Sequence, residues 1–519
     1  MAKIIKNKIK EWAWVYMALM LVSILSFSLM IFTLTVNDAD GTWHGSIAYT
    51  GYSELDEGRW LQPYIDKARF WVSPDPISSI VALAIYAAAF ILVMELLKIK
   101  DKRICAFSGM IFLVSTSVCA TLSHRYMSLE FSLAFLFAVL AAWCMMRIEK
   151  PALSVIASAP FVTMYMALYQ GFLGTTATVV LLYLILCLYR KEELKKIGSL
   201  ILKCLAGFLV GGTAYYVLWK EELWRLGSEE TSYGGADVFT IGGIFKNFFS
   251  TVSRPYTAYA DYFLNRTLTT TMLPKWFHVA LILLFFAASA CVIIRIIKGD
   301  TIRGVIMAVF TLLVPFATMW FYVITYTVSY MSMHMTINLA ASIAYMTAVT
   351  SIYMEEILKD KNDLYNKASA ALIVLLLIVF YGNYSMVKYD QMAMYMGKNS
   401  VNELGSEVIA ELLNEGLYDP DTNYCFIGSP TDNPLVFTND VFEKSNFYAK
   451  YGDWGHVASD NRQGWTGFSL HMKGIYLKIA DNEVIDAMNE DPRVEAMPVF
   501  PEKGSIQQMD NLVVIKISE

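Results

Sequence analysis

Long apolar blocks alternate with short polar ones over most of this chain, and the pattern changes only near residue 388. A helix of about 20 apolar residues crosses the ~30 Å hydrocarbon core of a bilayer. We therefore predict eleven transmembrane helices, over residues 13–36, 77–97, 104–122, 128–146, 152–170, 172–189, 199–219, 276–297, 302–324, 335–354 and 367–387. The first block is too long for a signal peptide and lacks a small-residue cleavage site, so we interpret it as an anchor.

Composition agrees with a polytopic α-helical membrane protein. Hydrophobic residues make up 56% of the chain, charged residues only 17%, and the mean hydropathy is +0.45. Soluble domains average about 25% charged residues, and a large soluble core would not supply so many uninterrupted apolar runs. The sequence contains no phosphate-binding loop, dinucleotide fingerprint or nucleophile elbow, which argues against an ATP-driven pump.

Lysine and arginine in the short loops predict the orientation, because cytoplasmic loops carry an excess of these residues. Cations cluster at residues 3–10, 98–103, 147–150, 190–196, 295–303 and 359–367, which all fall on one side in an eleven-helix arrangement. The opposite short loops, 169–172 and 325–334, have none. We therefore predict a cytoplasmic N-terminus, with loops 37–76 and 220–275 and the C-terminal tail outside.

The tail predicts a second domain, so we divide the chain into a transmembrane domain, 1–387, and an extracytoplasmic soluble α/β domain, 388–519. The tail holds 21 Asp and Glu against 10 Lys and Arg. Apolar residues recur at helical spacing over 400–417, and strand-like runs follow at 424–427 and 512–517. Nothing in this tail predicts catalysis, and its acidity is typical of a solvated surface.

The first candidate site residues lie in Asn37-Asp38-Ala39-Asp40, where the first helix would leave the bilayer. Charges cost several kcal/mol in hydrocarbon, so two acids at this depth indicate a site or a water-filled cavity. Trp43 and His44 follow directly. Aromatic rings interleaved with carboxylates suit a sugar, although Trp and Tyr also gather in any interfacial belt.

Two short outer loops carry further polar residues. Ser123-His124-Arg125-Tyr126 contains a single cation, which could hold a phosphate through two hydrogen bonds or could simply extend its side chain to the membrane interface. Tyr169 and Gln170 lie at the outer end of the fifth predicted helix, on the same side of the membrane as Asp38.

The order of these motifs resembles the bacterial glucosyltransferases that modify O-antigen, the Gtr type II-like family of polytopic GT-C-like glycosyltransferases. The motifs are an Asn-Asp-x-Asp helix exit, then Gly58-Arg59-Trp60, then Ser-His-Arg-Tyr, then Tyr169-Gln170, and the resemblance covers mainly residues 30–190. Two departures stand out. The adjacent Asp-Asp of the family is split here by Ala39, and Met127 and Ser128 replace an acidic residue that often follows in relatives.

The resemblance implies an enzyme of the bacterial cytoplasmic membrane that moves a sugar from a polyprenyl-phosphate donor to a cell-surface glycan or lipid-linked acceptor. It implies no nucleic-acid partner. On this view Asp38 or Asp40 is the general base, and the pair leaves open a divalent metal, Mg²⁺ or Mn²⁺. Arg59 and Arg125 are the candidates for the donor phosphate. The expected lining of the sugar and donor cavity is Tyr126, Tyr169, Gln170, Trp43 and His44.

Two other classes of function stay open at this point. A transporter or lipid-linked glycan flippase would show internal repeats and ionisable residues near mid-bilayer. The sequence shows no repeat, and its spans are nearly free of mid-helix charge apart from Glu130, which lies near one end of its span. A non-catalytic cell-wall assembly protein would instead use the acidic tail as its binding surface.

Overall fold

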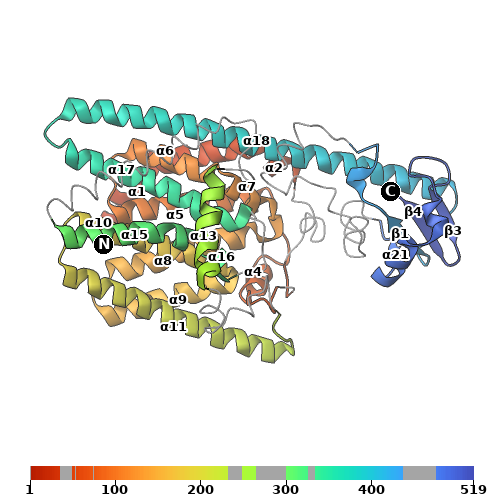
Figure 1. Cartoon of the computed structure of the whole chain (residues 1–519), viewed down its shortest axis with the longest axis horizontal. Coiled ribbons are helices and arrows are strands. Elements are labelled where there is room, and N and C mark those ends of the chain that lie inside the picture. Colours follow the sequence, from red (N-terminus) through yellow and green to blue (C-terminus); the bar gives the residue numbers. More distant parts are fainter. Residues whose placement is uncertain are drawn as a thin grey trace.

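The computed structural model describes residues 2–35, 50–52, 54–73, 75–231, 248–264, 300–324, 333–436 and 475–519. Its helices form a bundle from which one long helix projects to a small sheet near the C-terminus (Figure 1). The longer helices of the bundle are α1 (Ala2–Ser26), α5 (Ile77–Leu97), α6 (Lys102–Leu113), α8 (Ser128–Arg147), α9 (Pro151–Leu168), α10 (Leu173–Tyr189), α11 (Leu194–Leu226), α13 (Phe248–Leu264), α15 (Thr301–Thr318), α17 (Ile337–Ile357) and α18 (Asn362–Asn414).

Shorter elements complete the bundle: α2 (Ser28–Thr33), α4 (Gln62–Ala68), α7 (Thr116–Ser123), α16 (Phe321–Ile324) and the 3-10 turns η1 (Arg125–Met127), η2 (Gln170–Phe172) and η4 (Met333–Thr336). Nine of the described helices are long and apolar enough to cross a membrane, or ten if the bent pair α6–α7 is counted as one span. The polytopic helical fold is thus confirmed. Ten of the eleven predicted spans coincide with described helices, and the eleventh, 276–297, lies outside the described residues.

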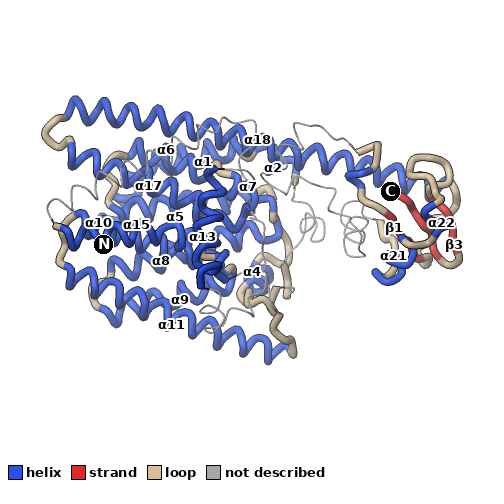
Figure 2. The backbone as a smooth tube through the Cα atoms, in the orientation of Figure 1, coloured by secondary structure: helices blue, strands red, loops and turns tan. Residues whose placement is uncertain are grey.

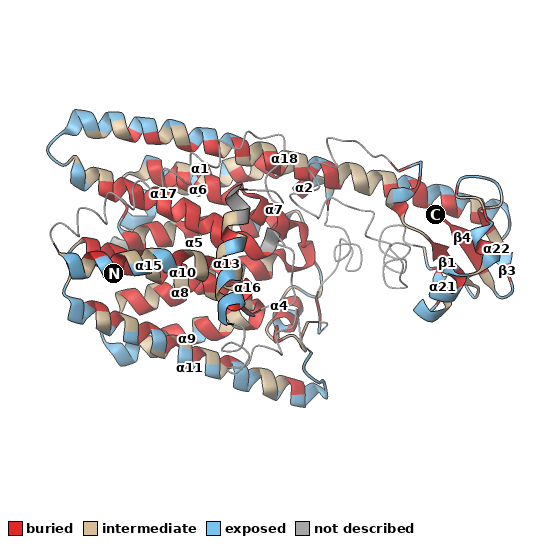
Figure 3. Cartoon of the chain, in the orientation of Figure 1, coloured by how far each residue is buried: buried red, intermediate tan, exposed pale blue. Residues whose placement is uncertain are grey.

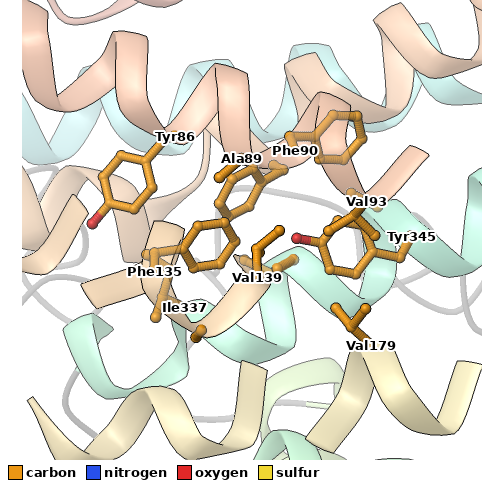
Figure 4. Packing of buried hydrophobic residues seen from close by; sticks show 14 of the residues in the cluster. Tyr86, Ala89, Phe90, Val93, Phe135, Val139, Val179, Ile337 and Tyr345 are labelled. Atoms are coloured by element: carbon orange, nitrogen blue, oxygen red, sulfur yellow. The ribbon is translucent and has the colours of Figure 1, made fainter. Parts of the chain in front are cut away.

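Aromatic side chains fill the centre of the bundle. The ring of Phe112 stacks on Phe90 and on Phe135, with ring centroids 6.0 and 5.1 Å apart, and Tyr345 also stacks on Phe90. Figure 4 shows that Phe90, Phe135 and Tyr345 come from different helices and pack in one cluster. The large buried surface holds the helices in one arrangement, and buried residues line their inner faces while the outer faces of α11 and α18 stay exposed (Figure 3).

Two helices are broken rather than straight. The predicted span 104–122 is the pair α6–α7, which bends by 50° at Val114–Ser115. Ser115 starts α7 by accepting the N–H of Val118 at its hydroxyl, a typical N-cap. The predicted span 13–36 is α1 followed by α2, with the break at Phe27.

The C-terminal part differs in one respect from the sequence prediction. The two helices expected over 367–387 and 400–417 form a single helix, α18, because the polar stretch between them contains no proline and its one glycine does not interrupt the helix. The last turns of α18 then pack against the sheet through Val401, Leu404 and Val408.

The strands near the C-terminus form one small sheet, as expected of a small α/β unit (Figure 2). Its strand order is β2-β1-β4-β3, and its elements are β1 (Asn423–Ile427), β2 (Lys478–Ile479), β3 (Ile506–Met509) and β4 (Leu512–Lys516), with η5 (Pro430–Asp432), α21 (Asn482–Asn489) and α22 (Pro492–Glu495). β1 pairs in parallel with both β2 and β4, whereas β3 is antiparallel. The predicted strands 424–427 and 512–517 correspond to β1 and β4.

Candidate active site

The candidate site lies at the end of the bundle that carries α2, α4, η1 and η2, which we call the loop end. The C-terminal sheet projects beyond this same end (Figure 1). Four residues predicted for the site, Asp38, Asp40, Trp43 and His44, lie outside the described residues. The other five, Arg59, Arg125, Tyr126, Tyr169 and Gln170, are all described, and their neighbours define the site below.

Arg59 lies between two acids and an aromatic ring. Its guanidinium forms ion pairs with Glu54 and with Glu57, the latter at 3.1 Å, and lies 5.0 Å from the centre of the Tyr169 ring. Only 8% of Arg59 is exposed. Arg59 and Tyr169, two predicted site residues far apart in the sequence, are therefore in contact.

Gln170 ties the same segment to a neighbouring helix. Its side-chain amide donates to the carbonyl of Glu57 at 2.7 Å and to the hydroxyl of Tyr215 on α11 at 3.0 Å. Gly58 makes this contact possible, because a Cβ at that position would lie 2.1 Å from the Tyr215 hydroxyl and 2.7 Å from the Gln170 nitrogen. Its φ of +92° also disfavours other residues. Steric crowding thus explains why a glycine precedes Arg59 in this motif.

Arg125 makes a buried ion pair that the sequence analysis did not foresee. Its Nε and Nη2 lie 3.0 and 2.9 Å from Oδ2 of Asp75, and both side chains are about 2% exposed. The other oxygen of Asp75 accepts the N–H of Ser79 and the hydroxyls of Ser78 and Ser79 at the start of α5. Asp75 thus joins the first turn of α5 to η1. The Asp-Pro-x-Ser-Ser sequence is a recognisable helix start, but nothing local in it indicates Arg125 as a partner.

Arg69 is the centre of a second buried cluster, one that sequence reasoning also missed. It pairs with Asp66 on α4, donates to the carbonyl of Tyr126 at 2.5 Å and lies 3.3 Å from Glu130 on α8. The remaining oxygen of Asp66 accepts the N–H of Gly51 at 2.7 Å. The segment that contains α4 was predicted as a loop, and this short helix is a correction: Pro63 suits its first turn.

Burial dominates the electrostatics of this cluster. It raises the pKa of Asp66 above the usual range, although the Arg69 guanidinium and the Gly51 N–H both favour the ionised form. Buried ion pairs have a desolvation cost that is offset only by good geometry and added hydrogen bonds. Together Asp75, Arg125, Asp66 and Arg69 fasten segment 50–76 onto η1.

These contacts also bear on what the site can bind. Arg59 and Arg125, the two predicted donor-phosphate residues, each have carboxylate partners within the protein. Tyr126 is a buried residue of η1 whose ring centre lies 6.0 Å from that of His124, and its carbonyl accepts from Arg69. No group of three or more metal-ligating side chains gathers among the described residues. The prediction of Mg²⁺ or Mn²⁺ concerns Asp38 and Asp40, which lie outside that range.

Comparison with known proteins identifies the family. Residues 45–354, more than half of the chain, match the family model described as Glucosyl transferase GtrII. The chain belongs to this family. The resemblance drawn from its motifs is confirmed, and the protein is a polytopic glucosyltransferase-family member. No curated protein and no solved structure matches the sequence.

The family match contains all five described site residues and both buried clusters. It begins after Asp38, Asp40, Trp43 and His44, so it leaves the roles of these four residues as predictions. Membership of the GtrII family implies two substrates, a sugar donor and an acceptor.

Proposed function

We propose that this protein is an inverting glucosyltransferase that uses a polyprenyl-phosphate glucose donor. Membership of the GtrII family carries the proposal. The acceptor would be a cell-surface glycan or a lipid-linked glycan at the outer face of the bacterial cytoplasmic membrane. A lipid-activated donor needs no nucleotide-binding loop, in agreement with the lack of such a motif in the sequence.

The carboxylates of Asp38 and Asp40 are the proposed groups for proton transfer. A hydroxyl of the acceptor attacks the anomeric carbon, its proton passes to one carboxylate, and the bond from that carbon to the phosphate oxygen breaks. Attack from the face opposite the phosphate inverts the anomeric centre. A positioned general base typically contributes 10²–10⁴-fold to the rate. The structure supports this role indirectly, because the buried clusters of Arg59 and Arg125 lie at the same end of the bundle as the exit of the first helix.

Orientation is part of the proposal. The positive-inside rule puts the N-terminus in the cytoplasm and therefore puts the loop end outside. The C-terminal sheet projects beyond the loop end, so on this orientation it is extracytoplasmic as well (Figure 1). Cysteine labelling from outside whole cells at an exposed position of the sheet, such as Asn511, checks this arrangement.

The experiment that tests the reaction compares Asp38→Asn and Asp40→Asn, made singly, in an assay with purified protein and polyprenyl-phosphate glucose. At least one variant should lose 10²–10⁴-fold in turnover. Asp56→Asn is the matched control, because Asp56 lies in the same loop and its carboxylate accepts from Thr231 at 2.9 Å. Full turnover in both test variants would refute the assignment. The anomeric configuration of the product, measured by NMR, separates inversion from retention.

A chelator separates the two roles open to the acid pair. If Asp38 and Asp40 hold Mg²⁺ or Mn²⁺, EDTA should abolish turnover and added metal should restore it. Turnover that persists in EDTA assigns the pair to proton transfer alone.

A further inference from the structure

Two residues of α18 hold the end of the first helix. Gln391 is fully buried beside the break between α1 and α2. Its amide nitrogen donates to the carbonyl of Ser26 at 2.8 Å, and its oxygen accepts the N–H of Met30 at 3.2 Å. Two turns further along α18, Lys398 donates to the carbonyl of Leu34 at 3.0 Å. Residues seven apart lie on the same face of a helix, so one face of α18 fixes both contacts.

The position of Lys398 follows from the Gln391 contact. Buried backbone groups at a helix break need partners, and Gln391 supplies one to each side of this break. Sliding α18 by even one turn would lose both bonds. The ammonium group of Lys398 is therefore held beside Leu34, four residues before Asp38 in the sequence.

Lys398 differs from the arginines of the site in its charge balance. Arg59 and Arg125 are each paired with a carboxylate. Among the described residues, Lys398 has no carboxylate partner, and the Leu34 carbonyl is its hydrogen-bond acceptor. It is half-buried, and it is repelled electrostatically by Arg125. Because Asp75 already balances Arg125, Lys398 is the one of these two cations without a carboxylate partner among the described residues, and its charge can attract an anion.

We propose that Lys398 binds the phosphate group of the polyprenyl carrier. This inference rests on the proposed function, since it names the residue that neutralises the leaving phosphate. An ammonium group serves as a point charge for phosphate, and its place beside Leu34 brings that charge to the segment that continues into Asp38 and Asp40. Arg59 and Arg125 then act mainly by holding segment 50–76 in place.

The chain provides a matched control for this residue. Lys388 lies on the same helix, is also half-buried and also donates to a carbonyl of the first helix, that of Leu25 at 3.4 Å. Within the described part of the chain no cation contributes to the electrostatics of Lys388, and its ammonium group lies 5.6 Å from the ring of Tyr384. Neutralising Lys388 therefore tests the loss of a lysine from α18 without touching the proposed phosphate position.

The test measures binding of farnesyl phosphate to the purified full-length protein in detergent. Lys398→Met should weaken binding about tenfold or more, the size of a lost charge-assisted contact. Lys398→Arg should restore most of the affinity, and Lys388→Met should stay within about twofold of the parent. Binding of farnesol, which lacks the phosphate, should be equal in all variants. Equal loss of farnesol and farnesyl phosphate in Lys398→Met would point to a packing defect and overturn the proposal.

A second arm separates the carrier from other lipid phosphates. Phosphatidylglycerol should compete poorly with farnesyl phosphate; competition at equal concentration would identify a general headgroup site and overturn the assignment to the carrier. A different result, full turnover in both Asp38→Asn and Asp40→Asn, would refute the proposed role of these residues in the reaction. Farnesyl phosphate binding can be read in either case, because it requires no turnover.

Discussion

One ion pair at each end of the helix bundle shows how differently paired charges can be placed. At the end that carries the N-terminus, Lys100 and Glu355 pair at 2.6 Å with 77% and 37% of their side chains exposed. At the loop end, Arg125 and Asp75 pair at 2.9 Å with only 2% of each exposed. The contact distances are similar, but the surroundings differ.

This difference separates charges that serve topology from charges that build a site. Cations in the short loops of one end are enough to orient a membrane protein, and they need no fixed partner. Buried pairs are costly to desolvate, and replacing them by apolar residues is often neutral or stabilising. A buried pair at the loop end therefore indicates that a particular geometry is required there.

The largest effect on stability is expected for Asp75→Ala. The substitution leaves Arg125 buried without its carboxylate, which should lower the free energy of unfolding by about 3–5 kcal/mol. It also removes the acceptor for the Ser79 N–H at the start of α5. Denaturant-induced unfolding in detergent measures the loss.

The double variant Asp75→Ala/Arg125→Met is the control for this prediction. It removes both charges, so it should recover a substantial part of the stability lost in the single variant. A single variant that unfolds within about 1 kcal/mol of the parent would mean that the pair is as weak as an exposed one.

A second, smaller effect should appear on changing the pH. Burial raises the pKa of Asp66 above the ordinary value of an aspartate, so the folded state holds this proton more tightly than the unfolded state does. Asp66 therefore stabilises the fold most below the unfolded pKa, and this contribution is lost as the pH rises through the folded pKa. Relative to Asp66→Asn, the parent should lose stability across that window, by at most about 1.4 kcal/mol per pH unit. A difference that stays constant with pH would contradict a raised pKa.

Much of the fold was predictable from hydropathy, because spanning length and composition are local properties of the sequence. Ten predicted spans coincide with described helices, and the two C-terminal strands were placed correctly. The continuity of α18 was missed, because a rise in polarity was interpreted as the end of a helix. A polar stretch indicates that a helix faces water, but it does not by itself end the helix.

The site was predictable only in part. The motif order indicated Arg59, Tyr169 and Gln170, and these residues are neighbours. Their acidic partners Glu54 and Glu57 lie in the same loop. Asp75 is fifty residues from Arg125, and Arg69 meets Glu130 from another element, so these pairs depend on tertiary packing. Lys398 lies far along the chain from every motif, and only the path of α18 brings it to the first helix.

The smallest expected effect concerns the opposite end of the bundle. Lys100→Ala should change the free energy of unfolding by no more than about 1 kcal/mol, because an exposed ion pair gains little Coulomb energy in water and restricts two long side chains. The same assay as for Asp75→Ala applies, at low and at high salt. Raising the salt should erase what difference there is, since it screens exposed charges but hardly affects buried ones. A loss comparable to that of Asp75→Ala, unaffected by salt, would mean that both ends depend on fixed ion pairs, and the distinction between orienting charges and site-building charges would no longer hold.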